Sequence, residues 1–232
     1  PVGRLIMSPP DAARFDHVPV MAAEIVAALA EVPAGVVLDA TVGGGGHASA
    51  VLERRADLRL VGLDRDATAL AAAAQRLEPF GERVVLRRAR FDQLGSVLAR
   101  EGIAGISAAV FDLGVSSPQL DVGERGFSFR HDGPLDMRMD DTDPLTAADV
   151  VNDYAEVELA RVLREYADER FARRIAAAVV AARPLRTTGE LAEVVRAAIP
   201  APARRRGGHP ATRTFQAIRI EVNRELDVLP VA

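Results

Sequence analysis

The sequence contains no cysteine, no tryptophan and no lysine, and aromatic residues make up only 4% of its 232 positions. Without cysteine the chain cannot form disulfides, thiolate zinc sites or iron–sulfur clusters, and it cannot use a cysteine nucleophile. The lack of disulfides fits a reducing compartment, so we expect a cytoplasmic protein. All 29 basic residues are arginine, whose planar guanidinium suits contacts with phosphates and bases.

Long apolar runs and a strong excess of one charge are also missing. The run Ile175–Ala182 is bounded by Arg174 and Arg183 and is far shorter than the ~20 residues that a membrane-spanning helix needs. Residues Pro1–Met21 carry charges without a continuous apolar segment, so we expect no secretion signal and no membrane association. The formal charge of −4 argues against a uniformly basic nucleic-acid binder but allows local basic patches.

Short apolar segments alternate with helical segments in the first half of the chain. Because strands that alternate with helices form right-handed crossovers, this pattern predicts an α/β fold with a doubly wound parallel sheet. The predicted strands are Val36–Ala40, Leu58–Asp64, Val84–Phe91 and Ala108–Gly114. The predicted helices are Met21–Leu29, Ala48–Arg55, Ala67–Leu77 and Leu94–Arg100.

The pattern changes after the fourth predicted strand. The segment Val115–Asp143 is rich in Gly, Pro, Asp and Ser and predicts a long loop, in which the acidic residues from Asp136 to Asp143 are expected to be solvated. A helical period then returns, and Thr187 and Glu190 have the spacing of a capping box. The predicted helices lie around 159–166, 171–182 and 191–198 and over Pro210–Leu229.

A glycine loop, Gly43-Gly44-Gly45-Gly46, connects the first predicted strand to the next helix. Its backbone N–H groups can approach an anionic ligand group closely, although the loop could also be only a permissive turn. Asp39 ends the first strand, where it could reach a ligand ammonium, and Asp64 ends the second, where a carboxylate can bind ribose hydroxyls. Because Asp39 would repel a pyrophosphate, the two acids favour S-adenosylmethionine over a dinucleotide.

Two further candidates follow the third and fourth predicted strands. Phe91 could stack on an adenine ring or pack in the core. Asp112 follows the fourth strand, at the edge of the sheet where open α/β folds bind ligands, and is the leading site carboxylate. It could instead cap the following loop, and His47 could cap a helix rather than contact a ligand.

Distinctive sequence motifs are spread over nearly the whole chain. They are His17–Met21, Asp39–Thr41, Gly45–His47, Gly62–Asp66, Phe91–Leu94, Asp112–Asp121, Arg125–Phe129, Asp136–Met139 and His209–Ile220. In these motifs the chain resembles the bacterial 16S ribosomal RNA cytosine-N4 methyltransferases, known as MraW or RsmH. The resemblance implies a class I, S-adenosylmethionine-dependent methyltransferase domain at 1–119, a helical RNA-recognition insertion at 120–214 and a return to the first domain at 215–232.

The resemblance also implies roles for individual residues. Gly45–His47 would contact the amino-acid end of S-adenosylmethionine and Asp64 its ribose, while Phe91, Asp112 and Gln119 would complete the pocket around adenine and the sulfonium. Family members often carry Ser directly after the Gly-Gly-His motif, where this chain has Ala48. They also continue with further segments that close the sheet, so the resemblance implies that C-terminal strands are missing from this chain.

The implied reaction methylates N4 of a cytidine in the decoding region of 16S ribosomal RNA. Displacement at a sulfonium needs no metal, and the four histidines have no ligand spacing, so we predict no metal site. The cytosine amine needs a proton acceptor, which could be Asp112 or a carbonyl of the turn Ser116-Ser117-Pro118. Because a paired base hides N4, the target must be unpaired or flipped out.

Arginines interleaved with aromatics predict the RNA contacts, although each arginine alone could belong to a solvated face. The candidates are Arg125, Phe127, Phe129, Arg130, Arg138, Arg204, Arg205, Arg206 and Arg213. The expected partner is 16S ribosomal RNA within the small ribosomal subunit. The sequence leaves the oligomeric state undetermined, with a homodimer as one option. Two other classes also stay open, a noncatalytic RNA-binding or assembly factor and a dinucleotide-dependent oxidoreductase.

Overall fold

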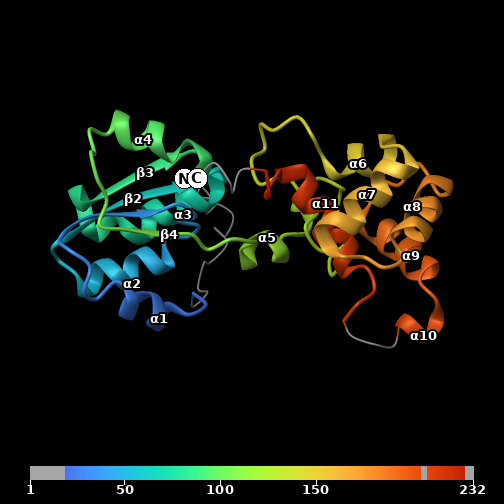
Figure 1. Ribbon diagram of the computed structural model, residues 1–232, viewed down its shortest axis with the longest axis horizontal. Helices are drawn as coiled ribbons and strands as arrows, with labels where there is room; N and C mark the ends of the chain where they lie inside the picture. The colour runs from blue at the N-terminus through green and yellow to red at the C-terminus, as the bar shows by residue number, and fades with distance from the viewer. Residues whose placement is uncertain (1–18, 205–207, 228–232) are drawn as a thin grey trace, which may run out of the picture.

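Two lobes lie side by side in the computed structural model, which describes residues 19–204 and 208–227 (Figure 1). The first half of the chain builds the sheet lobe, residues 19–114. The helical lobe, from residue 126 onward, follows the short helix α5, Ser117–Asp121, which lies between the two. Within the described ranges no helix is both long and apolar enough to cross a membrane.

The sheet lobe contains four parallel strands in the order β3-β2-β1-β4. They are β1 (Gly35–Asp39), β2 (Leu58–Asp64), β3 (Val84–Arg88) and β4 (Ala108–Val110). This arrangement confirms the predicted α/β fold. The third and fourth strands end earlier than predicted, so that Phe91 begins a 3-10 turn, Phe91–Gln93, and Asp112 lies in the loop beyond β4.

Helices cover both faces of this sheet (Figure 1). They are α1 (Ala22–Ala28), α2 (Gly46–Arg54), α3 (Ala67–Leu77) and α4 (Leu94–Arg100), and a 3-10 helix, Glu78–Arg83, follows α3. Val37 and Leu60 pack toward the helices α1, α2 and α3, whereas the neighbouring Leu38 and Val61 pack toward α4. This alternation is the two-residue period of strands that are buried on both faces.

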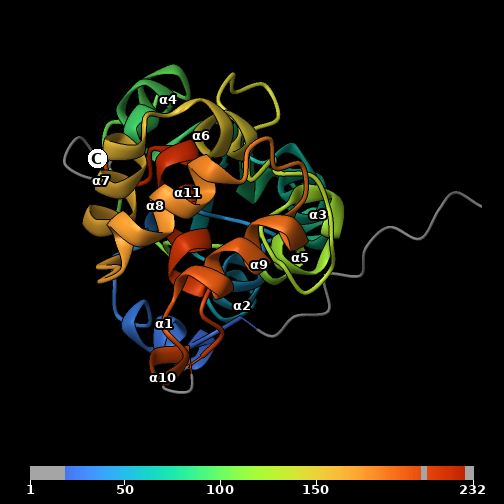
Figure 2. The ribbon, with the colours of Figure 1, turned by 90° about the vertical axis from the view of Figure 1, so that its right-hand side faces the viewer.

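The helical lobe is built from six helices among the described residues, and Figure 2 looks onto it with α11 in its middle. They are α6 (Ala147–Asp153), α7 (Glu156–Ala167), α8 (Ala172–Ala181), α9 (Thr188–Ala198), α10 (Ala201–Arg204) and α11 (Thr212–Asn223). The predicted helices correspond to α7, α8, α9 and α11, and the capping box of Thr187 and Glu190 is present.

Three expectations for the second half need correction. The segment predicted as a long loop contains α5 and a 3-10 turn, Gly123–Arg125, and the helix α6, which begins shortly after that segment, was missed. The chain does not return to the first domain at residue 215. Instead Phe215 and Ile218 of α11 are buried in the core of the helical lobe, because the apolar face of α11 packs against α7.

The acidic run was expected to be solvated, but it forms ion pairs with the edge of the sheet. Arg88 Nη2 lies 2.6 Å from a carboxylate oxygen of both Asp140 and Asp141, and Arg65 Nη2 lies 2.6 Å from Asp143 Oδ2. Opposite charges that are far apart in the sequence therefore bind the acidic loop of the helical lobe to the carboxyl ends of β2 and β3.

Asn223, the last residue of α11, is fully buried and connects three segments. Its Nδ2 donates to the carbonyls of Met137 (2.7 Å) and Arg219 (2.9 Å), and its Oδ1 accepts from the N–H of Met139 (2.8 Å). Its own carbonyl accepts from Arg65 Nη1 at 2.8 Å. This one side chain holds the end of α11 against the loop that precedes α6.

We predict that Asn223→Ala lowers the free energy of unfolding by about 2–4 kcal/mol, because it leaves a buried N–H and a buried carbonyl without partners. Urea denaturation measures the change. Gln216→Ala, at an exposed position on the same helix, is the control and should stay within about 0.5 kcal/mol. Equal effects of the two substitutions would contradict the anchoring role of Asn223.

Candidate functional site

A cavity of about 570 Å³ lies between the carboxyl ends of the strands and the helical lobe. Ligands of open α/β sheets bind at this edge, and the volume is in the range of small-molecule sites. The sheet lobe contributes Gly43, Gly44, Gly46, His47, Asp64, Phe91 and Asp112, and the turn before and within α5 contributes Ser116, Ser117, Pro118 and Gln119. The helical lobe contributes Met139, Arg219, Ile220, Glu225 and Leu226.

The glycine loop runs along one side of the cavity. Gly43 has a φ of 52° and Gly45 a φ of 77°, values that favour glycine, and α2 begins directly afterwards at Gly46. Gly45 faces away from the cavity, since a Cβ there would lie 3.2 Å from Leu77 of α3. Of the loop glycines, Gly43, Gly44 and Gly46 line the cavity, whereas Gly45, which was predicted to contact the ligand, does not.

Asp64 holds the glycine loop in place and also lines the cavity. Its Oδ2 accepts from the N–H of Gly43 and its Oδ1 from the N–H of Asp66, both at 2.9 Å. Burial raises the pKa of Asp64, although these two N–H groups oppose the effect. Each oxygen keeps a lone pair, so the carboxylate can still accept hydrogen bonds from a ligand.

Asp39 does not line the cavity, contrary to the expectation that it reaches a ligand ammonium. Only 3% of the residue is exposed, because it lies beneath the loop, where it accepts a hydrogen bond from the N–H of Thr41 at 3.2 Å. Burial raises the pKa of Asp39 to about 6, and the nearby carboxylates of Asp64 and Asp112 add to the effect.

Asp112 points its carboxylate toward open space beside the loop. Its N–H donates to Thr41 Oγ1 at 2.7 Å, which fixes the backbone, while 59% of the side chain is exposed. Within the described ranges the carboxylate accepts no hydrogen bond, and His47 Nδ1 lies 3.8 Å from Asp112 Oδ2. His47 Nε2 lies 2.9 Å from the carbonyl of Val20. Asp112 is therefore available to accept a proton or a hydrogen bond from a ligand.

Gln119 is buried and fixes the turn that contains Ser116, Ser117 and Pro118. Its Oε1 accepts from the N–H of Ser116 at 3.0 Å, and its Nε2 donates to Asp66 Oδ2 at 3.1 Å. Although burial of Asp66 acts in the opposite direction, hydrogen bonds from Arg125 and Gln119 lower its pKa. An ionised Asp66 thus binds the turn to the end of β2.

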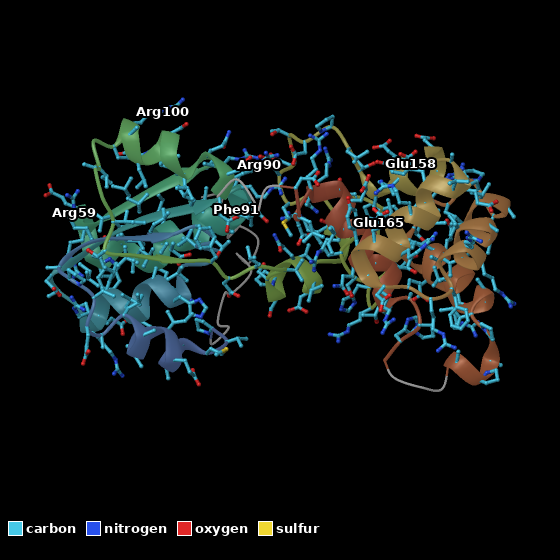
Figure 3. The ribbon with its side chains drawn as sticks, viewed as in Figure 1. Arg59, Arg90, Phe91, Arg100, Glu158 and Glu165 are labelled. Atoms are coloured by element: carbon cyan, nitrogen blue, oxygen red, sulfur yellow. The ribbon has the colours of Figure 1, made fainter. Side chains whose placement is uncertain are left out.

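Phe91 lines the cavity at the end of the sheet lobe that faces the helical lobe (Figure 3). Its ring packs edge-to-face against Phe111, with the ring centroids 6.0 Å apart. Arg90 and Asp92 form an ion pair on either side of Phe91 in the sequence. This arrangement leaves a ring at the cavity wall on which a flat ligand group can stack.

Several residues predicted to contact RNA already have partners inside the protein. Arg125 Nη2 bonds Asp66 Oδ2 at 2.9 Å, and Arg138 bonds Asp136 at 2.7 Å and nearby carbonyls. Phe127 is only 5% exposed, so it cannot stack on a base.

The remaining candidates differ in exposure. Phe129 packs against His209 and Phe215, with ring centroids 4.3 and 5.0 Å apart. Among the candidates whose side chains the structure describes, Arg130 and Arg213 are exposed, and Arg213 Nη1 also donates to the carbonyl of Asp168 at 2.9 Å. Arg204 ends α10, and Arg205 and Arg206 lie outside the described residues. In the described part of the chain no three His, Asp or Glu side chains are grouped as metal ligands, and the absence of a metal stays a prediction.

The wall from the helical lobe was not among the predicted site residues. Met139 and Arg219 lie in two of the distinctive motifs, Asp136–Met139 and His209–Ile220, but nothing in these motifs assigned either side chain to the site, and Glu225 lies outside them. A separation of six positions between Arg219 and Glu225 gives no helical signal, because residues meet on a helix at three or four positions. Only the approach of the two lobes places these side chains at the cavity.

Comparisons with known proteins give a consistent result. The family model of the MraW methylase family matches residues 14–232.

Three relatives are named ribosomal RNA small subunit methyltransferase H. The one from Symbiobacterium thermophilum is 57% identical over 219 residues, which cover 93% of this chain and 69% of the relative. The one from Mycobacterium sp. (strain KMS) is 60% identical over 197 residues, covering 85% of this chain and 53% of the relative. The third, from Heliobacterium modesticaldum, is 51% identical over 223 residues, covering 94% of this chain and 71% of the relative. The chain thus spans from about half to about seven tenths of the length of these relatives.

The raised pKa of Asp39 predicts a pH-dependent stability. Its proton is lost near pH 3.8 in the unfolded chain but near pH 6 in the folded protein, so its stabilising contribution is full below about pH 4 and lost as the pH rises through 6. The unfolding free energy of the wild type, relative to that of Asp39→Asn, should fall by about 3 kcal/mol from about pH 4 to about pH 8. Urea denaturation at both pH values measures this difference. Asp121→Asn, at an exposed carboxylate, should give a constant difference.

Proposed function

Since the chain belongs to the MraW methylase family, we propose that it transfers the methyl group of S-adenosylmethionine to N4 of a cytidine in the decoding region of 16S ribosomal RNA. The observation that carries this proposal is the cavity at the carboxyl edge of the sheet, where the glycine loop, Asp64 and the exposed carboxylate of Asp112 come together. The parallel sheet with helices on both faces agrees with the fold of a class I methyltransferase.

The residues of the cavity fit an adenosyl ligand that carries a positive charge. The glycine loop offers backbone approach for the amino-acid end, the free lone pairs of Asp64 suit ribose hydroxyls, and Phe91 offers a stacking surface. Asp64 and Asp112 place two carboxylates beside the loop, which favours a sulfonium over a pyrophosphate. We assign the binding of S-adenosylmethionine to four groups, the glycine loop, Asp64, Phe91 and Asp112.

When bound, S-adenosylmethionine supplies an electrophilic methyl carbon for an in-line displacement. The cytosine amine is a weak nucleophile, because its lone pair is delocalised into the ring. Asp112 accepts one N4–H and takes its proton as the new bond forms, and the Ser116–Pro118 turn, whose carbonyls are the other candidate acceptors, also lines the cavity. Gln119 keeps this turn in position through Asp66.

The helical lobe contributes to RNA binding in this proposal. Arg130 and Arg213 remain exposed and are assigned contacts with backbone phosphates, whereas Arg125 and Arg138 support the loop that lines the cavity. Because the cavity lies between the two lobes, the target base has to leave its helix to enter it. A substrate within the small ribosomal subunit implies that the protein acts in the cytoplasm.

Binding of S-adenosylmethionine distinguishes the proposed methyltransferase from a dinucleotide-dependent oxidoreductase. We expect S-adenosylmethionine and its demethylated product to bind the wild-type protein in isothermal titration calorimetry. Asp64→Asn should weaken this binding at least about 10-fold, because one charge-assisted acceptor is lost. Asp121→Asn is the matched control and should bind normally. Heat with NADH but not with S-adenosylmethionine would contradict the proposal.

Methyl transfer is tested with the tritiated donor on small ribosomal subunits from a strain that lacks the enzyme, followed by nucleoside mass spectrometry. In the whole protein Asp112→Ala should reduce transfer at least about 100-fold, because the proton acceptor is removed, while the unfolding midpoint is retained. Asp121→Ala is the control. RNA binding without transfer by the wild type would support the noncatalytic alternative, and undiminished transfer by Asp112→Ala would reject the assigned role.

A further inference from the structure

The wall of the cavity that the helical lobe supplies contains an ion pair with no role in the chemistry described so far. Arg219 Nε donates to Glu225 Oε1 at 2.7 Å, and Arg219 Nη2 donates to Glu225 Oε2 at 2.9 Å. Both residues line the cavity, and their side chains are only 17% and 19% exposed. A two-point pair of this kind is planar and holds both groups in one orientation.

The end of α11 brings the two partners together. Arg224 has a φ of 50°, in the left-handed region, and its N–H bonds the carbonyl of Glu221, while the N–H of Glu225 bonds the carbonyl of Ile220 at 3.2 Å. These bonds end the helix and turn the chain back, so that Glu225 meets Arg219. Asn223 donates to the carbonyl of Arg219, which fixes the pair relative to the rest of the lobe.

The pair keeps unused hydrogen-bonding capacity. Arg219 uses Nε and one N–H of Nη2 for Glu225, which leaves the second N–H of Nη2 and both N–H groups of Nη1. Each carboxylate oxygen of Glu225 retains a free lone pair. Ile220 and Leu226, which neighbour the two partners in the sequence, also line the cavity. The pair therefore presents an acceptor and several donors next to each other in the cavity wall.

We propose that the Arg219–Glu225 pair reads the pairing edge of the acceptor base, an inference that rests on the proposed methyl transfer. Cytosine presents one donor, N4–H, followed by two acceptors, N3 and O2. Glu225 accepts one N4–H and Arg219 donates to N3 and O2, in keeping with the preference of acidic side chains for cytosine N4. Uracil presents an acceptor and then a donor at the first two positions, so it would face Glu225 with O4 and Arg219 with N3–H.

This assignment leaves the other face of the amine for the reaction. The N4–H that Glu225 accepts stays on nitrogen, and the second N4 proton passes to Asp112 as the bond from nitrogen to the methyl carbon forms and the bond from that carbon to sulfur breaks. Glu225 and Arg219 therefore determine which base is accepted, while the sheet lobe carries out the transfer. A site that is built to pair with polar groups rejects a base that leaves them unpaired.

The test compares Glu225→Gln and Arg219→Met with a matched control in the whole protein. The control is Glu101→Gln, because Arg87 and Glu101 form a pair with the same distances, 2.7 and 2.9 Å, that does not line the cavity. Three quantities are measured: the Kd of S-adenosylmethionine, kcat/KM for RNA, and the ratio of the affinities for RNA with cytosine or uracil at the methylated position.

We expect both cavity variants to lower kcat/KM at least about 100-fold and to bring the cytosine-to-uracil affinity ratio close to one, with the donor Kd unchanged within about threefold. Glu101→Gln should match the wild type in all three. If the wild type transfers methyl groups and both cavity variants keep its kcat/KM and base preference, only the assigned role of the pair is overturned. If the wild type transfers none, the proposed function fails and the assignment fails with it.

Discussion

The carboxyl end of β2 holds the site together through three consecutive charged residues. Asp64 accepts from the N–H of Gly43 and so sets the glycine loop. Arg65 donates to the carbonyl of Asn223 and to Asp143, and so attaches the helical lobe. Asp66 accepts from Gln119 and Arg125, and so attaches the turn before α5. Side chains alternate along a strand, but at its end the backbone turns, and these three neighbours can reach three different segments.

These contacts make the cavity depend on polar interactions that are partly removed from water. Buried charges cost free energy unless each has partners, and the Asp66 carboxylate has Thr68 N–H, Gln119 and Arg125. Asp39 lacks such compensation, accepting only from the N–H of Thr41 among the described residues, and its pKa rises accordingly. The glycine loop is held by the Asp64 carboxylate, whose pKa is also raised by burial, so the geometry of the loop is coupled to the protonation of that group.

The helical lobe does more than extend the surface of the protein. Its acidic loop pairs with Arg88 and Arg65 at the end of the sheet, and the end of α11 places Arg219 and Glu225 opposite the glycine loop. The chain segment that follows β4 starts at the edge where ligands bind, because β4 ends there with the other parallel strands. This starting point gives the second lobe direct access to the cavity, and one wall from each lobe suits a reaction between two bound molecules.

The sequence by itself determined the parallel α/β sheet, since strand-length apolar segments alternated with helical periods, and it identified Asp64, Asp112 and the glycine loop because they follow strands at one edge. It predicted Thr187 as a helix cap for the same local reason. Local patterns could not determine which glycines line the cavity, that Asp39 is buried beneath the loop, or that Arg125 and Arg138 have partners within the protein, because those outcomes depend on how the chain packs in three dimensions. The pairing of Arg219 with Glu225 at the cavity was decided only by the turn after α11 and the approach of the lobes, since long-range packing leaves no period in the sequence.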